Sequence, residues 1–316
     1  MNRKLFFILA AIVPFQSFSQ YVLKEGYLSL VPKTKVDKEY KFKNLILYPV
    51  FAEKDFISQN SDYSHYTPLE EALKSGKVKI TEQEHTGAQV NNLYIENLSA
   101  DTVFIMAGQV IKGGKQDRVI SDDRVLEPHS GKIDLSVFCV EHNRWTYKTD
   151  RSFTQTYSVP ANSIRKSATY DKNQYDVWDK VSDVTTKQNA SSSTGTYTAL
   201  AEAKDFNKEI GEYDEFFRNA FNKLNNCVGF VGVSGDKIIG CDIFASNKLF
   251  RQQLDDLVQS YSTEAITYGK TAINDYDKVL NYLKGFLSNE INQDEKIKGL
   301  GNDYQYKGKR VHINTY

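Results

Sequence analysis

The chain has 316 residues, of which 40% are hydrophobic and 13% aromatic, so it can bury enough apolar surface for one large domain or two smaller ones. Lysine plus arginine and aspartate plus glutamate both number 40, and the net charge is therefore zero. This balance excludes the electrostatic footprint of a nucleic-acid-binding protein or of a protein drawn to an anionic membrane.

The first 19 residues have the three-part pattern of a secretory signal peptide. Arg3 and Lys4 form the positive region, residues 5–13 the apolar core, and residues 17–19 a small-x-small cleavage site that leaves Gln20 as the mature N-terminus. The apolar core is shorter than the roughly 20 residues that span a bilayer. We therefore expect an exported protein, periplasmic or extracellular, without a membrane anchor.

Residues 20–186 form a predicted strand-rich part. Between short strands at 45–50 and 93–96, residues 67–73 predict a short helix that begins at the N-cap Thr67 and ends before Gly76. Residues 103–111 are apolar on both alternating faces, as in a central strand, with Gly108 as a bulge or a close backbone approach.

A second clear strand covers residues 133–140, where Ile133 and every second residue after it are apolar. Continuing that alternation places Glu141 on the apolar face and points His142 and Arg144 the other way. Further on, residues 171–184 predict a helix in which Gln174 and Trp178 share one face.

Residues 187–199 are rich in serine and threonine and predict a flexible polar connector. Beyond it, residues 200–316 predict an α+β C-terminal part that packs with the first part as one unit. Its expected elements are helices at 204–224, 247–269 and 271–288, a hairpin at 227–244 and a closing strand at 310–314. A strand-rich part followed by a helix- and hairpin-rich part indicates an α+β fold.

The three cysteines, Cys139, Cys227 and Cys241, are an odd number for an exported chain. In the predicted hairpin, a two-residue turn places Ser234 opposite Lys237 and therefore Cys241 opposite Phe230. Cys227 would then be three positions out of register with Cys241, too far for a disulfide. We expect all three to be buried thiols without an intramolecular disulfide.

Two polar runs, 113–118 and 141–145, directly follow predicted strands. Charged groups crowded at the ends of buried strands are costly unless they pair with each other or with a ligand. We expect the two runs to meet in space and to form a site for a small polar or anionic ligand. The candidate ligand-binding residues are Lys115, Gln116, Asp117, Arg118, Glu141, Arg144 and Trp145.

In this site Lys115 and Arg118 would hold an anion and Gln116 would supply amide hydrogen bonds. Glu141 would orient an arginine, with Arg118 the nominated partner, and Trp145 would stack on a ring.

Two other interpretations remain open, and no catalytic residue is assigned. The protein could be a hydrolase in which buried Glu141 or Asp117 acts as general base. Alternatively, the same residues could form a buried ion network in a structural or interaction module. A concave pocket exposing Arg118 and Glu141 would favour a ligand site or an enzyme, and a sealed network would favour a structural role. The oligomeric state stays open.

No cofactor is expected. Gly113-Gly114-Lys115-Gln116 lacks both the leading glycine and the hydroxyl residue of a phosphate-binding loop, and the histidines lack metal-ligand spacing. Cys139 and His142 would point to opposite faces of a strand, which excludes a thiol–imidazole pair.

The runs 107–118 and 139–145, together with Gln174 and the Val177-Trp178 pair, resemble the ARG and rhodanese-phosphatase-superfamily-associated domain family, where ARG denotes ADP-ribosylglycohydrolase. The resemblance covers most of residues 40–316. The family name implies a link to ADP-ribose or another nucleotide-derived ligand, without naming a reaction. The predicted export signal sets this chain apart, because an exported protein meets little intracellular nucleotide.

Overall fold

The computed structural model describes residues 27–60, 63, 65–83, 91–144, 152–190, 192–287 and 293–316. The predicted signal peptide at 1–19 and the candidate site residue Trp145 lie outside this part. Helices and strands are mixed within it, so the predicted α+β class is confirmed. None of the helices described is both long and apolar enough to cross a membrane.

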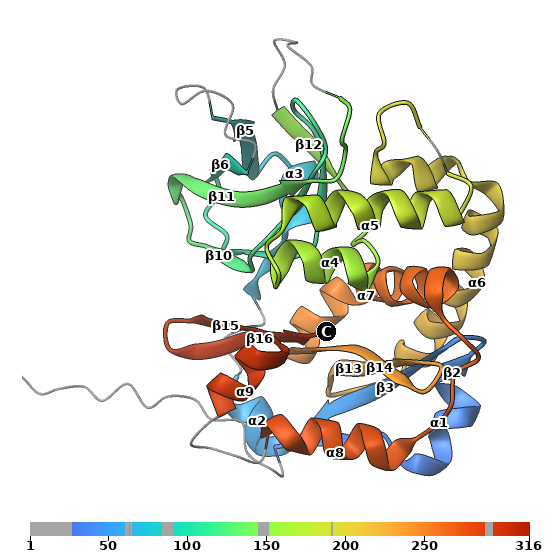
Figure 1. Cartoon of the computed structure of the whole chain (residues 1–316). Helices are drawn as coiled ribbons and strands as arrows, with labels where there is room; N and C mark the ends of the chain where they lie inside the picture. Colours follow the sequence, from blue (N-terminus) through green and yellow to red (C-terminus); the bar gives the residue numbers. More distant parts are fainter. Residues whose placement is uncertain are drawn as a thin grey trace, which may run out of the picture.

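The larger sheet takes its strands from both ends of the chain, in the lower half of Figure 1. Its order is β1-β3-β13-β14-β16-β15, with β2 also paired to β3, and all pairs are antiparallel. The bounds are β1 (Leu28–Leu30), β2 (Lys41–Phe42), β3 (Leu45–Ala52), β13 (Cys227–Ser234), β14 (Lys237–Phe244), β15 (Gly301–Tyr306) and β16 (Lys309–Thr315). The first strands of the chain thus belong to the same sheet as the last ones.

The other half is a closed barrel with strand order β11-β6-β5-β12-β8-β9, accompanied by a small sheet, β10-β7-β4. The bounds are β4 (Thr67–Pro68), β5 (Val78–Glu82), β6 (Asn92–Asn97), β7 (Val103–Ile105), β8 (Val110–Gly113), β9 (Arg118–Ile120), β10 (Arg124–Leu126), β11 (Gly131–Cys139) and β12 (Ser152–Tyr157).

The predicted single strand over 103–111 is wrong, because the chain turns between β7 and β8 at Gly108. Gly108 has φ +94°, and a Cβ there would lie 3.0 Å from the side chain of Arg165. Both the backbone conformation and the close approach require glycine.

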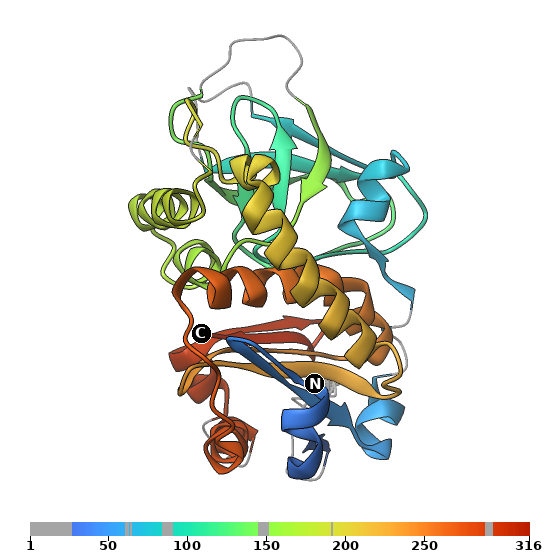
Figure 2. The same ribbon diagram turned by 90° about the vertical axis from the view of Figure 1, so that its right-hand side faces the viewer.

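Helices fill the space between the barrel and the larger sheet, and others cover the far face of the sheet (Figure 1). In Figure 2, α6 runs diagonally from the sheet up to the barrel. The helices are α1 (Lys33–Glu39), α2 (Lys54–Gln59), α3 (Leu69–Lys74), α4 (Asn162–Thr169), α5 (Gln174–Lys187), the 3-10 helix η2 (Tyr197–Glu202), α6 (Lys204–Phe221), α7 (Asn247–Tyr268), α8 (Tyr276–Leu287) and α9 (Gln293–Leu300). The helix predicted at 67–73 begins later, because Thr67 and Pro68 pair with β7 as β4.

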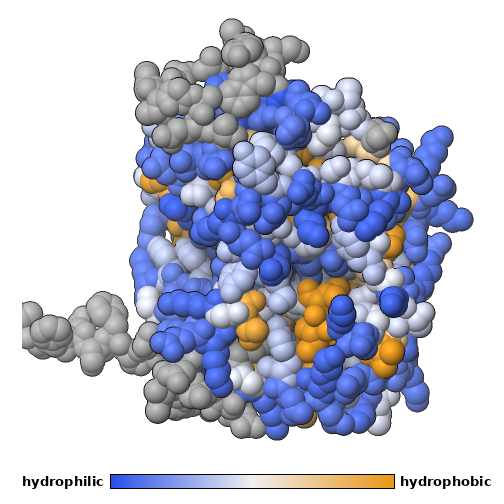
Figure 3. Space-filling view, viewed as in Figure 1, coloured by the Kyte–Doolittle hydropathy of each residue, from blue (hydrophilic) through white to orange (hydrophobic). Residues whose placement is uncertain are grey.

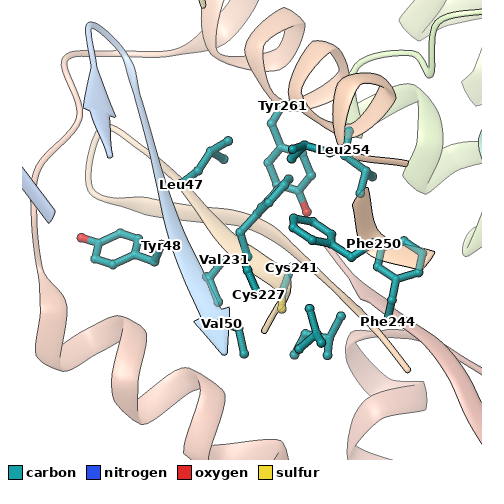
Figure 4. Close-up of a cluster of buried hydrophobic side chains, with 14 of the residues drawn as sticks. Leu47, Tyr48, Val50, Cys227, Val231, Cys241, Phe244, Phe250, Leu254 and Tyr261 are labelled. Carbon is teal, nitrogen blue, oxygen red and sulfur yellow. The ribbon is translucent and has the colours of Figure 1, made fainter. Parts of the chain in front are cut away.

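The main apolar core surrounds the larger sheet, with side chains from α6 and α7 and also from α1, α2, α8 and α9, and Figure 4 shows part of it. Phe230 and Tyr261 meet edge to face there, with ring centroids 4.9 Å apart. A second core joins the barrel to α4 and α5, and a third fills the barrel. The face drawn in Figure 3 is mostly hydrophilic; its largest hydrophobic patch lies in the lower half, and smaller ones are scattered elsewhere.

All three cysteines are buried, as expected, and the structure holds them as free thiols. The turn register of the hairpin is confirmed, with Ser234 opposite Lys237. The predicted partner of Cys241 is wrong, because a register shift between Gly232 and Val233 places Cys241 opposite Val231. Such a bulge adds one residue to a strand, which the two-residue turn alone does not reveal.

Candidate functional site

The two polar runs meet at one end of the barrel, which confirms the prediction that they converge. The backbone N–H of Asp117 donates to the Glu141 carboxylate at 3.1 Å, and Gln116 Nε2 donates to the carbonyl oxygen of Glu141 at 2.8 Å. The cause is the pairing of β9 with β11, which sets Arg118 opposite Cys139 and so aligns the segments that flank them.

The ion pairs differ from the prediction, and the assignment of Arg118 to Glu141 is wrong. Arg144 Nε lies 2.6 Å from Glu141 Oε2, and Arg144 Nη2 lies 3.0 Å from Asp117 Oδ1. Arg118 instead lies 3.9 Å from Glu82 at the end of β5. The strand alternation failed because β11 ends at Cys139, so the chain bends before Arg144 and returns it to Glu141.

Asp117 connects this cluster to the segment that begins η2. Its Oδ2 accepts the hydroxyls of Thr196 and Thr198, each at 3.2 Å, and its Oδ1 accepts the N–H of Gly113 at 3.2 Å. Both threonines lie within residues 187–199, the segment predicted as a polar connector. That segment therefore carries η2 onto the end of the barrel.

Most of the cluster is buried, although 30% of the Arg144 side chain is exposed. Arg118 is 0% exposed, Glu141 3% and Asp117 5%. Lys115 is half-buried, and its backbone N–H donates to Glu82 at 2.7 Å. Most of the charged groups neutralise one another, which leaves little unbalanced charge to hold an anion.

Cys139 links the cluster to α5. Its thiol donates to Gln116 Oε1 at 3.2 Å, and the Gln174 amide both accepts from its N–H at 2.8 Å and donates to its carbonyl at 2.9 Å. Burial raises the pKa of the Cys139 thiol to about 11, so the group is a protonated hydrogen-bond donor and not a nucleophile. Next to it, the rings of His142 and Trp178 meet edge to face at 4.4 Å.

A second buried polar cluster, which the sequence analysis missed, joins the barrel half to the larger sheet. Arg165 Nη2 lies 2.7 Å from Asp242 Oδ1, and His312 lies between Asp123, at 2.7 Å, and Asp242, at 3.1 Å. The Tyr261 hydroxyl also donates to Asp242, at 2.7 Å. One signal existed: Asp242 and His312 each stand between apolar neighbours in a strand, where a charge has to be paired.

In this second cluster His312 and Asp242 are held in their charged forms although they are buried. Burial alone would keep His312 neutral, but the attraction of Asp123, together with hydrogen bonds to Asp123 and Asp242, raises the pKa of His312 to about 9. Burial likewise opposes ionisation of Asp242, yet Arg165 and His312 hold the pKa of that carboxyl below its usual range. The cluster is fully enclosed, and we assign it a structural role.

An open cleft of about 370 Å³ lies between α3, the end of β12, η2, α6 and α7. Asp256 of α7 stands in its wall, where its Oδ2 accepts from Gln109 Nε2 at 3.4 Å. Burial raises the pKa of Asp256 to about 7, with Glu70 adding to the effect. The sequence held a signal here too, because Asp256, Gln259 and Thr263 share one face of a predicted helix.

The described residues hold no cluster of three or more histidine, cysteine or acidic side chains arranged for a metal ion. Residues 33–315 match the family model of the ARG and Rhodanese-Phosphatase-superfamily-associated Protein domain. No curated protein and no solved structure matches the chain.

Proposed function

The chain belongs to the ARG and Rhodanese-Phosphatase-superfamily-associated Protein domain family, and we propose that it is an exported protein that binds a small polar molecule in the cleft beside Asp256. The observation that carries this proposal is the cleft itself. Its volume of about 370 Å³ falls within the range of roughly 300–1,000 Å³ that is usual for small-molecule sites.

The lining of the cleft combines apolar walls with a few polar groups, as ligand sites do. Phe206 and Ile210 of α6 and Leu200 of η2 provide the apolar surface. Glu70 of α3 and Asp256 of α7 provide carboxyl groups. A ligand could therefore bury an apolar body and direct a polar group to a carboxylate.

In this proposal the largely buried cluster at the end of the barrel positions one wall of the cleft. Thr196 and Thr198 flank Tyr197, which lines the cleft, and both threonines donate to Asp117. The N–H of Tyr197 also donates to the carbonyl oxygen of Val140, at 2.9 Å. Asp117, together with Glu141 and Arg144 behind it, would thus hold η2 in place instead of contacting the ligand.

The charge of the cleft bears on the ligand that the family name implies. The described residues that line it include Glu70 and Asp256 but no lysine or arginine. A nucleotide diphosphate such as that of ADP-ribose would meet carboxylates there without a compensating cation, which is unfavourable. We therefore favour a ligand without phosphate groups.

A second candidate function is hydrolysis at the same cleft. A carboxyl group with a pKa of about 7 is suited to act as a general acid or base near neutral pH, and burial gives Asp256 that value. Asp256 is a better candidate than Glu141 or Asp117, because these two already accept charged or hydroxyl donors from Arg144, Thr196 and Thr198. Hydrolysis would require that Asp256→Asn abolish turnover and keep substrate binding.

A thermal-shift screen of small polar molecules, with ADP-ribose included, tests the binding proposal. A ligand that binds only the folded state raises the melting temperature, and the rise continues with the logarithm of the ligand concentration above its Kd. We expect at least one compound to stabilise the wild type and Ala100→Phe, whose exposed site lies away from the cleft, but not Ala201→Phe, which fills the cleft. Equal stabilisation of Ala201→Phe, or no stabilising compound and no co-purifying molecule in native mass spectra, would contradict the proposal.

Export is tested separately. We expect expression of the full chain in a Gram-negative host to give a periplasmic protein whose first residue is Gln20. Recovery of the chain from the cytoplasm with Met1 intact would contradict export.

A further inference from the structure

We propose that the cleft beside Asp256 takes an organic cation, a compound with a protonated amine attached to an aromatic or aliphatic body. This inference rests on the proposed function and names the ligand class of the same site.

The charge of the cleft is the first argument. Glu70 and Asp256 approach it from α3 and α7, and no basic side chain stands among its described lining residues. Glu70 does pair with Lys74 at 2.5 Å, but the Lys74 side chain is 70% exposed and such a surface pair is weak. The described lining of the cleft therefore offers two carboxyl groups and no cation, an arrangement that a ligand's ammonium group would complement.

The environment of Asp256 is the second argument. Its Oδ2 receives a long hydrogen bond, 3.4 Å, from the neutral amide of Gln109, whose own Oε1 accepts the N–H of Met106. A neutral amide at that distance stabilises a carboxylate far less than a cation does. An amine bound in the cleft would supply the charged donor that Gln109 does not provide.

Aromatic rings are the third argument. Tyr157, Tyr197 and Phe206 all line the cleft, and the rings of Tyr157 and Tyr197 meet edge to face at 6.0 Å. The ring of Tyr157 already has a cation near it, because Lys112 Nζ lies 5.7 Å from its centroid. Tyrosine rings attract ammonium groups and also pack against apolar bodies, so they suit both parts of an organic amine.

The proposal predicts a pH dependence, because only the ionised carboxylate attracts a cation. The charged groups that act on Asp256 are Glu70 of α3, Asp255 of α7 and Arg165 of α4, and Gln109 is its hydrogen-bond donor. Burial, Glu70 and Asp255 raise the pKa, and Gln109 and Arg165 oppose them, for a value of about 7. Affinity for an amine should therefore rise as the pH rises through about 7.

Three probes with one skeleton test the ligand class by titration calorimetry: tyramine, the alcohol tyrosol and the acid 4-hydroxyphenylacetate. We expect tyramine to bind the wild type at least about tenfold more tightly than either of the others, a difference of about 1.4 kcal/mol. Asp256→Asn should weaken tyramine about tenfold or more, whereas Asp236→Asn, at an exposed turn position outside the cleft, should not. If Asp256→Asn does not fold, Glu70→Gln in α3 replaces it, with Glu71→Gln as its control.

The outcomes separate this inference from the proposed function. If tyrosol or 4-hydroxyphenylacetate binds as tightly as tyramine, and Ala201→Phe abolishes that binding, the proposed preference for a cation is refuted. The cleft then remains the binding site. Tyramine binding that survives Ala201→Phe would refute the location. Absence of tyramine binding would refute the ligand class, and the wider screen would then decide whether the cleft binds anything.

Discussion

Thr198 and Asp117 are 81 positions apart in the sequence, yet the Thr198 hydroxyl donates to Asp117 Oδ2 at 3.2 Å. This bond fixes η2 against the end of the barrel, together with the matching bond from Thr196. The barrel end, the start of η2 and one wall of the cleft are therefore one connected unit.

Asp117→Asn tests that connection. The amide cannot balance the Arg144 guanidinium, and one of its two groups becomes a donor facing other donors, so we expect a loss of roughly 2–4 kcal/mol of unfolding free energy. Chemical denaturation measures it. Asp122→Asn, at an exposed pair with Lys172, serves as the control and should change stability by less than about 0.5 kcal/mol. Equal effects at the two sites would show that the cluster does not hold the fold.

Arg118→Lys should also destabilise the protein, because Arg118 is fully buried beside Glu82. Lysine keeps the charge but cannot reproduce the planar set of donors, and we expect a loss of roughly 2–4 kcal/mol. Arg218→Lys, with a half-exposed side chain paired to Asp255, is the matched change and should be nearly neutral. An unchanged melting temperature in Arg118→Lys would instead return Arg118 to the list of candidate ligand-binding residues.

His312 should make the stability fall at alkaline pH. Its pKa in the folded protein is about 9, above the ordinary 6.5, because the attraction of Asp123 and Asp242 outweighs the effect of burial. The imidazolium therefore stabilises the fold fully below about pH 6.5, and that stabilisation is lost as the pH rises through about 9. Over this window we expect a loss of roughly 3 kcal/mol.

Urea denaturation across that pH window checks the expectation. His312→Asn should be less stable at every pH and should show a flatter pH profile. His129→Asn, at an exposed position with φ 51°, where asparagine is tolerated, should keep the wild-type profile. A wild-type slope in His312→Asn would exclude His312 as the titrating group.

The three thiols should be unreactive in the folded protein. Burial raises the pKa of Cys139 to about 11 and that of Cys227 to about 12, and it raises the pKa of Cys241 as well. We expect no labelling by iodoacetamide near pH 8 in native protein, and three labels after unfolding without a reductant. Mass spectrometry counts the labels, and a single label in the unfolded, unreduced chain would reveal a disulfide.

The convergence of the two polar runs was predictable, because both follow strands and strand ends carry their flanking residues together. The pairing within the cluster was not. Alternation along a strand holds only while the strand continues, and β11 ends two residues before Glu141. The partner of Arg118, Glu82, comes close only because the barrel closes, which depends on tertiary packing and not on local sequence.

In the second cluster, too, the sequence does not reveal which charged groups pair, and here the partners are farther apart along the chain. His312 and Asp123 are 189 positions apart, and His312 and Asp242 are 70 apart. A single sequence can mark each of them as a charge among apolar neighbours, but it does not say which charge meets which. The cleft is harder still to predict, because its walls come from α3, η2, α6, α7 and the end of β12.

The pairing of β3 with β13, and of β14 with β16, has a consequence for how the chain is made. Strand β3 (residues 45–52) cannot pair with β13 until residues 227–234 have been synthesised. Strand β14 likewise cannot pair with β16 until residues 309–315 have been synthesised. Contacts this distant in sequence slow folding. For a chain that is exported as we propose, this delay would apply to the larger sheet, whose N-terminal strands would reach the secretion channel before their partners are made, and not to the barrel, whose strands all lie within residues 78–157.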